Sequence, residues 1–83
     1  LLDGVEPDII DTIYHTVEHG VQPEPIQGLR ARWLGHRLYV ELDLLLPGDC
    51  SIQAGQALAA TVKSQLEEQI PYLGHTAIRV TCR

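Results

Sequence analysis

GLRARWLGHRLYVELDLLLP, residues 28–47, is the stretch that decides the fold. Apolar and polar side chains alternate through it in two runs, over 28–34 and 37–46, with the dipeptide Gly35-His36 between them. Alternation with a period of two predicts strands buried on one face, and a glycine-containing dipeptide between two such runs predicts a hairpin turn. We therefore expect an antiparallel hairpin whose second strand is the most apolar segment of the chain.

Two acids, Glu41 and Asp43, lie two residues apart on the polar side of the second strand. The register that the turn sets places Arg30 opposite Glu41 and Arg32 opposite Tyr39. Such pairs predict a cross-strand ladder of charges, which stabilises a sheet modestly. The alternative is that Asp43, with or without Glu41, binds a cation. The pattern of residues leaves both interpretations open.

Helical and extended patterns flank the hairpin. Apolar residues recur every four positions over residues 6–19, which predicts a helix ended by Gly20. A second helix is expected to be capped by Ser51 and to extend to residue 70, because Pro71 stops it. Residues 75–82 alternate again and predict a third strand.

The element order α-β-β-α-β predicts an α+β fold in a single domain spanning residues 1–83. Since β-α-β crossovers are right-handed, the second and third strands are expected to be parallel, with the second in the centre. The three strands form a mixed sheet, and two helices cover one of its faces in a two-layer sandwich. The other face is either solvated or an interface, and it carries Arg30, Arg32, Tyr39, Glu41, Asp43, Leu45, Arg79 and Thr81.

The composition excludes several classes of function. Eleven acidic residues against six basic ones give a net charge of −5, which argues against nucleic-acid binding and permits a cation partner. A run of about 18 apolar residues, which a membrane helix needs, is missing, as is a signal peptide. The serines have no His-Asp partner that the sequence reveals and the glycines form no phosphate loop, so we expect no enzyme. The start at Leu1 rather than Met suggests a fragment of a longer chain.

Four histidines are candidate metal ligands. His15 and His19 are spaced i, i+4 on the first helix and can face one ion, although a polar helix flank explains them equally. His36 and His75 precede or begin parallel, adjacent strands, so they are expected at one end of the sheet, as ligands or as two loop histidines.

Two cysteines, Cys50 and Cys82, follow the other ends of the same two strands. They are too few for a disulfide scaffold, and we expect a reduced, cytosolic setting. Two thiolates would suit Zn²⁺. The alternative is two unrelated reduced thiols.

Three segments together resemble the C-terminal cytoplasmic domain of cation diffusion facilitator transporters: LLDGVEPDIIDTIYHTVEHG, GLRARWLGHRLYVELDLLLPGDCSIQAGQALAATVKSQLEEQIP and TAIRVTCR. The resemblance covers essentially the whole chain. It implies a metallochaperone-like, ferredoxin-like fold and a homodimer below the membrane that closes when divalent cations bind. It also implies export of Zn²⁺, Mn²⁺ or Fe²⁺ by a membrane-embedded part of the same chain, in the inner or a magnetosome membrane. The residues then expected at the dimer interface are Arg30, Arg32, Leu45 and Arg79.

The metal ligands that the resemblance implies are mostly replaced in this chain. In this chain, the positions that the family fills mainly with histidine are occupied, in chain order, by Gln27-Gly28, Asp43, Gln56 and Arg79. Thr81 stands two residues after Arg79, where the family has an acidic residue. A carboxylate remains a competent ligand, whereas a guanidinium repels cations. The leading expectation is a dimeric metal-sensing domain that uses Asp43 and Glu41, and the alternative is a metal-independent dimerisation domain in which Arg79 pairs with Asp43 in place of the cation.

A rival hypothesis from another class is a stand-alone metallochaperone-like interaction module. The fold favours it, but the chain lacks a Cys-x-x-Cys motif. A ligand-binding regulatory domain would need a loop rich in glycine and aspartate, which the sequence does not contain.

Overall fold

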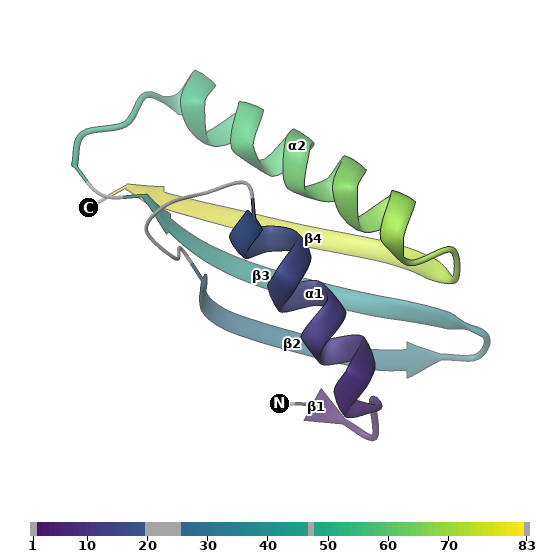
Figure 1. Ribbon diagram of the computed structural model, residues 1–83. Helices are drawn as coiled ribbons and strands as arrows, with labels where there is room; N and C mark the ends of the chain where they lie inside the picture. Colours follow the sequence, from purple (N-terminus) through teal and green to yellow (C-terminus); the bar gives the residue numbers. More distant parts are fainter. Residues whose placement is uncertain (1, 20–25, 47, 83) are drawn as a thin grey trace.

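A computed structural model describes residues 2–19, 26–46 and 48–82 of the chain. Its elements follow one another along the chain as Figure 1 shows: β1 (Leu2–Asp3), α1 (Pro7–His19), β2 (Ile26–Leu34), β3 (Arg37–Leu46), α2 (Ile52–Gln69) and β4 (Leu73–Cys82). The predicted α-β-β-α-β order is confirmed, and the boundaries agree to within two residues. Gly20, expected to end the first helix, lies outside the described residues.

The strands form one sheet in the order β1-β2-β3-β4. β2 and β3 are antiparallel, while β3 and β4 are parallel, as the right-handed crossover through α2 predicts. β3 therefore lies between two long neighbours. The two-residue β1, which pairs in parallel with β2, is an addition to the expected three-stranded sheet, because a segment so short has no periodicity to read.

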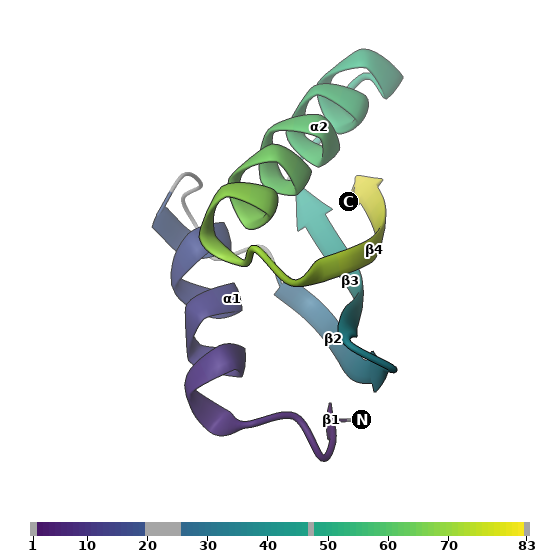
Figure 2. The same ribbon diagram turned by 90° about the vertical axis from the view of Figure 1, so that its right-hand side faces the viewer.

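Both helices cover the same face of the sheet (Figure 2), so the domain is the expected two-layer sandwich. One apolar core lies between the layers, and β3 contributes every second residue to it. No polar or charged side chain is buried among the described residues. The core consists of Val5, Ile10, Ile13, Val17, Ala31, Leu38, Val40, Leu42, Leu44, Val62, Leu66 and Ile70.

The hairpin turn has the expected position and sets the expected register. Gly35 has a φ of 63°, while His36 has no positive φ, which is the pattern of a type II′ turn with glycine at its first central position. Arg30 pairs with Glu41 across the two strands, as predicted. The acids of β3 therefore point away from the helices.

Cys50 and Cys82 form a disulfide, so the expectation of two unrelated reduced thiols is wrong. The parallel ladder places Cys82 beside Leu46, and Cys50 follows Leu46 by only four residues. The two Cα atoms are 5.6 Å apart, which is the usual separation for a disulfide. The bond closes the segment that contains α2 and β4, at the end of β4.

Reducing this disulfide is predicted to lower the free energy of unfolding by about 3–4 kcal/mol, because the cross-link removes the closure entropy of the loop between Cys50 and Cys82, which contains α2 and β4, from the unfolded chain. Urea unfolding followed by Trp33 fluorescence, with and without dithiothreitol, measures the loss. The double variant Cys50→Ser/Cys82→Ser is the control and should not respond to the reductant. Equal urea midpoints for the oxidised and reduced chain would contradict this role.

Candidate functional site on the open sheet face

The open sheet face is the surface of β2, β3 and β4 that points away from the helices. Its side chains lie in three rows across the strands, because the register aligns one residue from each strand. The rows are Arg32–Tyr39–His75, Arg30–Glu41–Ala77 and Gly28–Asp43–Arg79. A shallow hollow of about 340 Å³ lies over the second and third rows, where the small side chain of Ala77 leaves room.

Glu41 is paired with Arg30 in the middle row. The Arg30 Nε donates to Oε1 of Glu41 over 2.8 Å, and the two side chains are 54% and 39% exposed, respectively. The hydrogen bond from Arg30 is the main cause that lowers the pKa of Glu41 below its ordinary value, and the same bond raises the pKa of Arg30. The ladder predicted from the sequence therefore exists at this position.

Asp43 lies between a glycine and an arginine in the third row. Its Oδ1 is 3.7 Å from Nε of Arg79, a loose ion pair in which the arginine side chain is 75% exposed and the aspartate 36%. A Cβ on Gly28 would lie 3.2 Å from Oδ2 of Asp43, which is tighter than ordinary contact. Gly28 therefore leaves the space that the carboxylate occupies, a role that no pattern of residue types reveals.

The first row is held by ring contacts. The rings of Tyr39 and His75 stack with centroids 4.8 Å apart, and the Arg32 guanidinium lies 5.3 Å from the centroid of the Tyr39 ring. Such a cation–π contact restrains an exposed arginine modestly. His75 thus stacks on β3, while His36 lies exposed in the hairpin turn.

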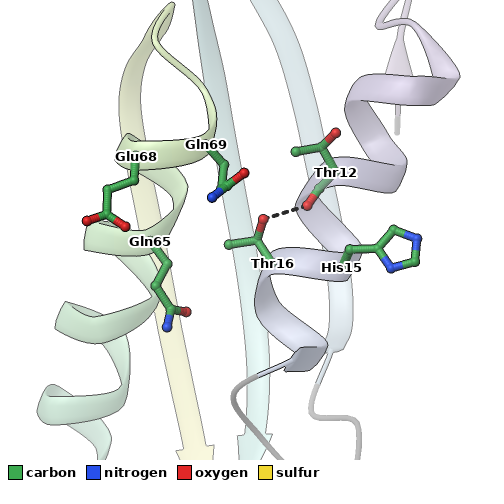
Figure 3. Close-up of a pocket in the computed structure, with 6 residues that line it drawn as sticks. All are labelled: Thr12, His15, Thr16, Gln65, Glu68 and Gln69. Carbon is green, nitrogen blue, oxygen red and sulfur yellow. Dashed lines mark hydrogen bonds between the residues drawn. The ribbon is translucent and has the colours of Figure 1, made fainter.

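His15 lines a groove of about 490 Å³ between the two helices, together with Thr12, Thr16, Gln65, Glu68 and Gln69. Figure 3 shows that His15 points away from α2 and that Glu68 points away from α1, so the two do not converge. The hydroxyls of Thr12 and Thr16 donate to main-chain oxygens one turn earlier in α1. The side chain of His19, its predicted partner, lies outside the described residues.

Within residues 2–19, 26–46 and 48–82, no group of three or more His, Cys, Asp or Glu side chains lies close enough to hold a metal ion. Glu41 and Asp43 share the open sheet face, each beside an arginine of the same chain. The remaining candidates are distributed over α1, the hairpin turn and β4.

Residues 5–81 match the family model of the cation efflux protein cytoplasmic domain. The chain belongs to this family, a family of transporter domains rather than of enzymes.

Two curated relatives are the probable cation efflux system proteins Rv2025c and MT2084 of two strains of Mycobacterium tuberculosis. Each is 26% identical over 73 residues, which is 88% of this chain. The chain spans only 22% of their length. In the described part of this chain, no helix is both long and apolar enough to cross a membrane.

Solved structures of the MamM CTD are similar in fold. A nickel form has a TM-score of 0.77 at 14% identity and covers 94% of this chain and 99% of that one. A copper form has a TM-score of 0.75 at 14% identity, covering 92% of this chain and 95% of that one. A cadmium form has a TM-score of 0.76 at 15% identity, covering 93% and 96%. These matches confirm the metallochaperone-like fold expected from the sequence.

Replacing Arg30 with glutamine is predicted to raise the pKa of Glu41 toward its ordinary value, since the main cause of the shift is lost. Because the folded-state pKa is lowered, the stabilisation by this pair is present above the ordinary pKa and is lost as the pH falls through the lowered one. A carboxyl NMR titration measures the shift. Arg79→Gln is the matched control, because the charge of Arg79 contributes least to the lowered pKa of Glu41, so its removal should change this pKa least. An unchanged pKa in Arg30→Gln would refute the assignment.

Proposed function

We propose that this chain is the cytoplasmic dimerisation domain of a membrane-embedded cation efflux transporter, and that Arg79 takes the place of a cation beside Asp43. The observation that carries this proposal is that both acids of the open sheet face are already paired with arginines of their own chain. Repulsion between the acids of two copies is then reduced without a metal. The domain would hold the transporter's two copies together whether or not a cation is present.

The open sheet face suits a two-fold interface with a second copy. It carries charges of both signs, in Arg30, Arg32 and Arg79 against Glu41 and Asp43, so the same surface can complement itself. Leu45 of β3 is partly exposed on this face, where it adds apolar area. These features support Arg30, Arg32, Leu45 and Arg79 as interface residues.

The second candidate function is metal sensing by the same dimer. It is favoured by the looseness of the Asp43–Arg79 pair, whose 3.7 Å separation is too long for a hydrogen bond. A divalent cation such as Zn²⁺, Mn²⁺ or Fe²⁺ could then displace Arg79 and bind Asp43, with Glu41 nearby, across the two copies. The cation would favour the closed dimer only if the closed form bound the cation more tightly than the open form does. Metal forms of substituted variants of the MamM CTD, with nickel and copper in two histidine variants and cadmium in a glutamate variant, support this version.

The histidine pairs His15 with His19 and His36 with His75 remain predictions of separate surface sites. For the whole protein we propose export of a divalent cation through membrane segments outside this chain. The membrane is an inner membrane or, by the likeness to MamM, a magnetosome membrane.

Isothermal titration with Zn²⁺, Mn²⁺ and anaerobic Fe²⁺ separates the two candidates. If Arg79 replaces the cation, the native chain gives no binding heat, and Arg79→Gln gains binding because the Asp43 carboxylate is uncovered. The double variant Arg79→Gln/Asp43→Ala is the control and should lose that gain. Heat from the native chain that Asp43→Ala abolishes would instead establish the metal-sensing version.

Sedimentation equilibrium tests the proposed interface. Leu45→Glu is predicted to weaken dimerisation by roughly tenfold or more, because it places an unpaired charge in the interface. Ile52→Glu is the matched control, since Ile52 is an apolar residue of the helical layer that is already 77% exposed. Equal weakening by both variants, or by neither, would contradict an interface on the open sheet face.

A further inference from the structure

The Cys50–Cys82 disulfide lies on the opposite side of the domain from the open sheet face. It joins Cys50, in the segment just before α2, to Cys82, the last residue of β4. Figure 1 shows the start of α2 and the end of β4 on the same side of the domain. Cys82 is exposed and Cys50 is partly exposed, so a thiol in solution can reach the bond. In a family of cytoplasmic domains this is unusual, because the cytosol keeps thiols reduced and the disulfides found there are mostly catalytic or redox-sensing.

The first half of α2, residues 52–60, is weakly packed. None of its residues is buried, whereas Val62 and Leu66 in the second half are 1% or less exposed. Gly55 faces Val80 of β4 without a side chain to fill the contact, and a glycine inside a helix lowers its stability. The Ser51 hydroxyl, which accepts a hydrogen bond from the Ala54 N–H over 3.0 Å, caps this half but does not attach it to the sheet.

A groove of about 270 Å³ runs between this half of α2 and β4, next to the disulfide. Its floor is apolar, formed by Ile78 and Val80, and its α2 side carries the small residues Gly55 and Ala59. Leu58 packs against the core from this half but is only partly buried, and no residue of 52–60 is fully buried. Segments without fully buried residues open at lower free energy than the core. The disulfide is the one covalent tie across this groove.

We propose that the Cys50–Cys82 disulfide is a redox latch, whose reduction by a cellular dithiol releases residues 52–60 from β4 and opens this groove. A thiolate of the dithiol attacks the exposed Cys82 sulfur, the Cys50–Cys82 bond breaks, and Cys50 leaves as a thiolate that takes a proton from water. The second thiol of the reductant then attacks the mixed disulfide and releases Cys82. Two electrons pass to the protein, and the reductant ends as its own disulfide.

The latch goes beyond the proposed function and does not depend on it. Residues 52–60 and the groove lie in the helical layer, whereas Asp43, Arg79 and the proposed interface lie on the open sheet face. A redox input would therefore act on the domain from the side opposite to any cation or second copy.

Amide hydrogen exchange by mass spectrometry, on the oxidised chain and on the chain reduced with dithiothreitol, tests the latch. At short exchange times, when only local opening contributes, amides of residues 52–60 are predicted to exchange about tenfold faster after reduction, while those of residues 62–69 stay protected because Val62 and Leu66 remain buried. Cys50→Ser/Cys82→Ser should match the reduced chain and ignore the reductant. Uniform acceleration along α2, or none, would overturn the proposal.

Gly55→Ala provides a matched control that leaves both cysteines in place. A Cβ at this position would lie 3.5 Å from Cγ1 of Val80, an ordinary contact, and alanine favours the helix. The variant should therefore slow exchange over residues 52–60 in the reduced chain by about fivefold. If exchange over residues 52–60 were equally fast in reduced Gly55→Ala and in the reduced native chain, weak packing of this half would not be the cause.

Equilibration in glutathione buffers, followed by alkylation of free thiols, shows whether the Cys50–Cys82 disulfide is reduced at cytosolic ratios of reduced to oxidised glutathione. The proposal predicts that the bond passes from oxidised to reduced as the buffer is varied around cytosolic glutathione ratios. A bond that stays oxidised in the folded chain at every such ratio would be a structural disulfide and would contradict the proposal.

Discussion

The burial of β3 is the constraint on which the rest of the structure depends. Its alternate residues Leu38, Val40, Leu42 and Leu44 are 1% or less exposed and form the centre of the core against both helices. Because side chains alternate along a strand, burying these four forces Tyr39, Glu41, Asp43 and Leu45 onto the opposite face. A shift of one residue in register would bury both acids, so the apolar pattern that folds the domain also places its charges.

The parts of the fold that follow from periodicity could be predicted from the sequence. The hairpin turn at Gly35-His36 fixed Arg30 opposite Glu41, and the handedness of the crossover made β4 the parallel neighbour of β3. The register that brings Arg79 beside Asp43 is seen only in the structure. The disulfide could not be predicted this way, because the expectation rested on the usual redox state of cytosolic thiols rather than on the distance between two strand ends. The role of Gly28 depends on the position of one carboxylate oxygen, which no pattern of residue types encodes.

The candidate site could be predicted only in part, because a pattern of residue types can indicate which residues are neighbours but not the distance between their side chains. Sequence reasoning placed Asp43 and Arg79 on neighbouring strands but gave no distance between them, and it could not tell whether the arginine pairs with the acid or merely lies nearby. The structure gives a loose pair on an exposed surface. Pairs of this kind contribute little to folding stability, so they are better understood through their effect on what can approach the carboxylate.

If the acids of the open sheet face are neutralised within the chain, as we propose, the proposed dimer does not need a cation to close. Small-angle X-ray scattering of the dimer, with and without saturating Zn²⁺, tests this most directly. The account predicts the same radius of gyration in both conditions. A smaller radius with Zn²⁺ that Asp43→Ala restores to the metal-free value would contradict it.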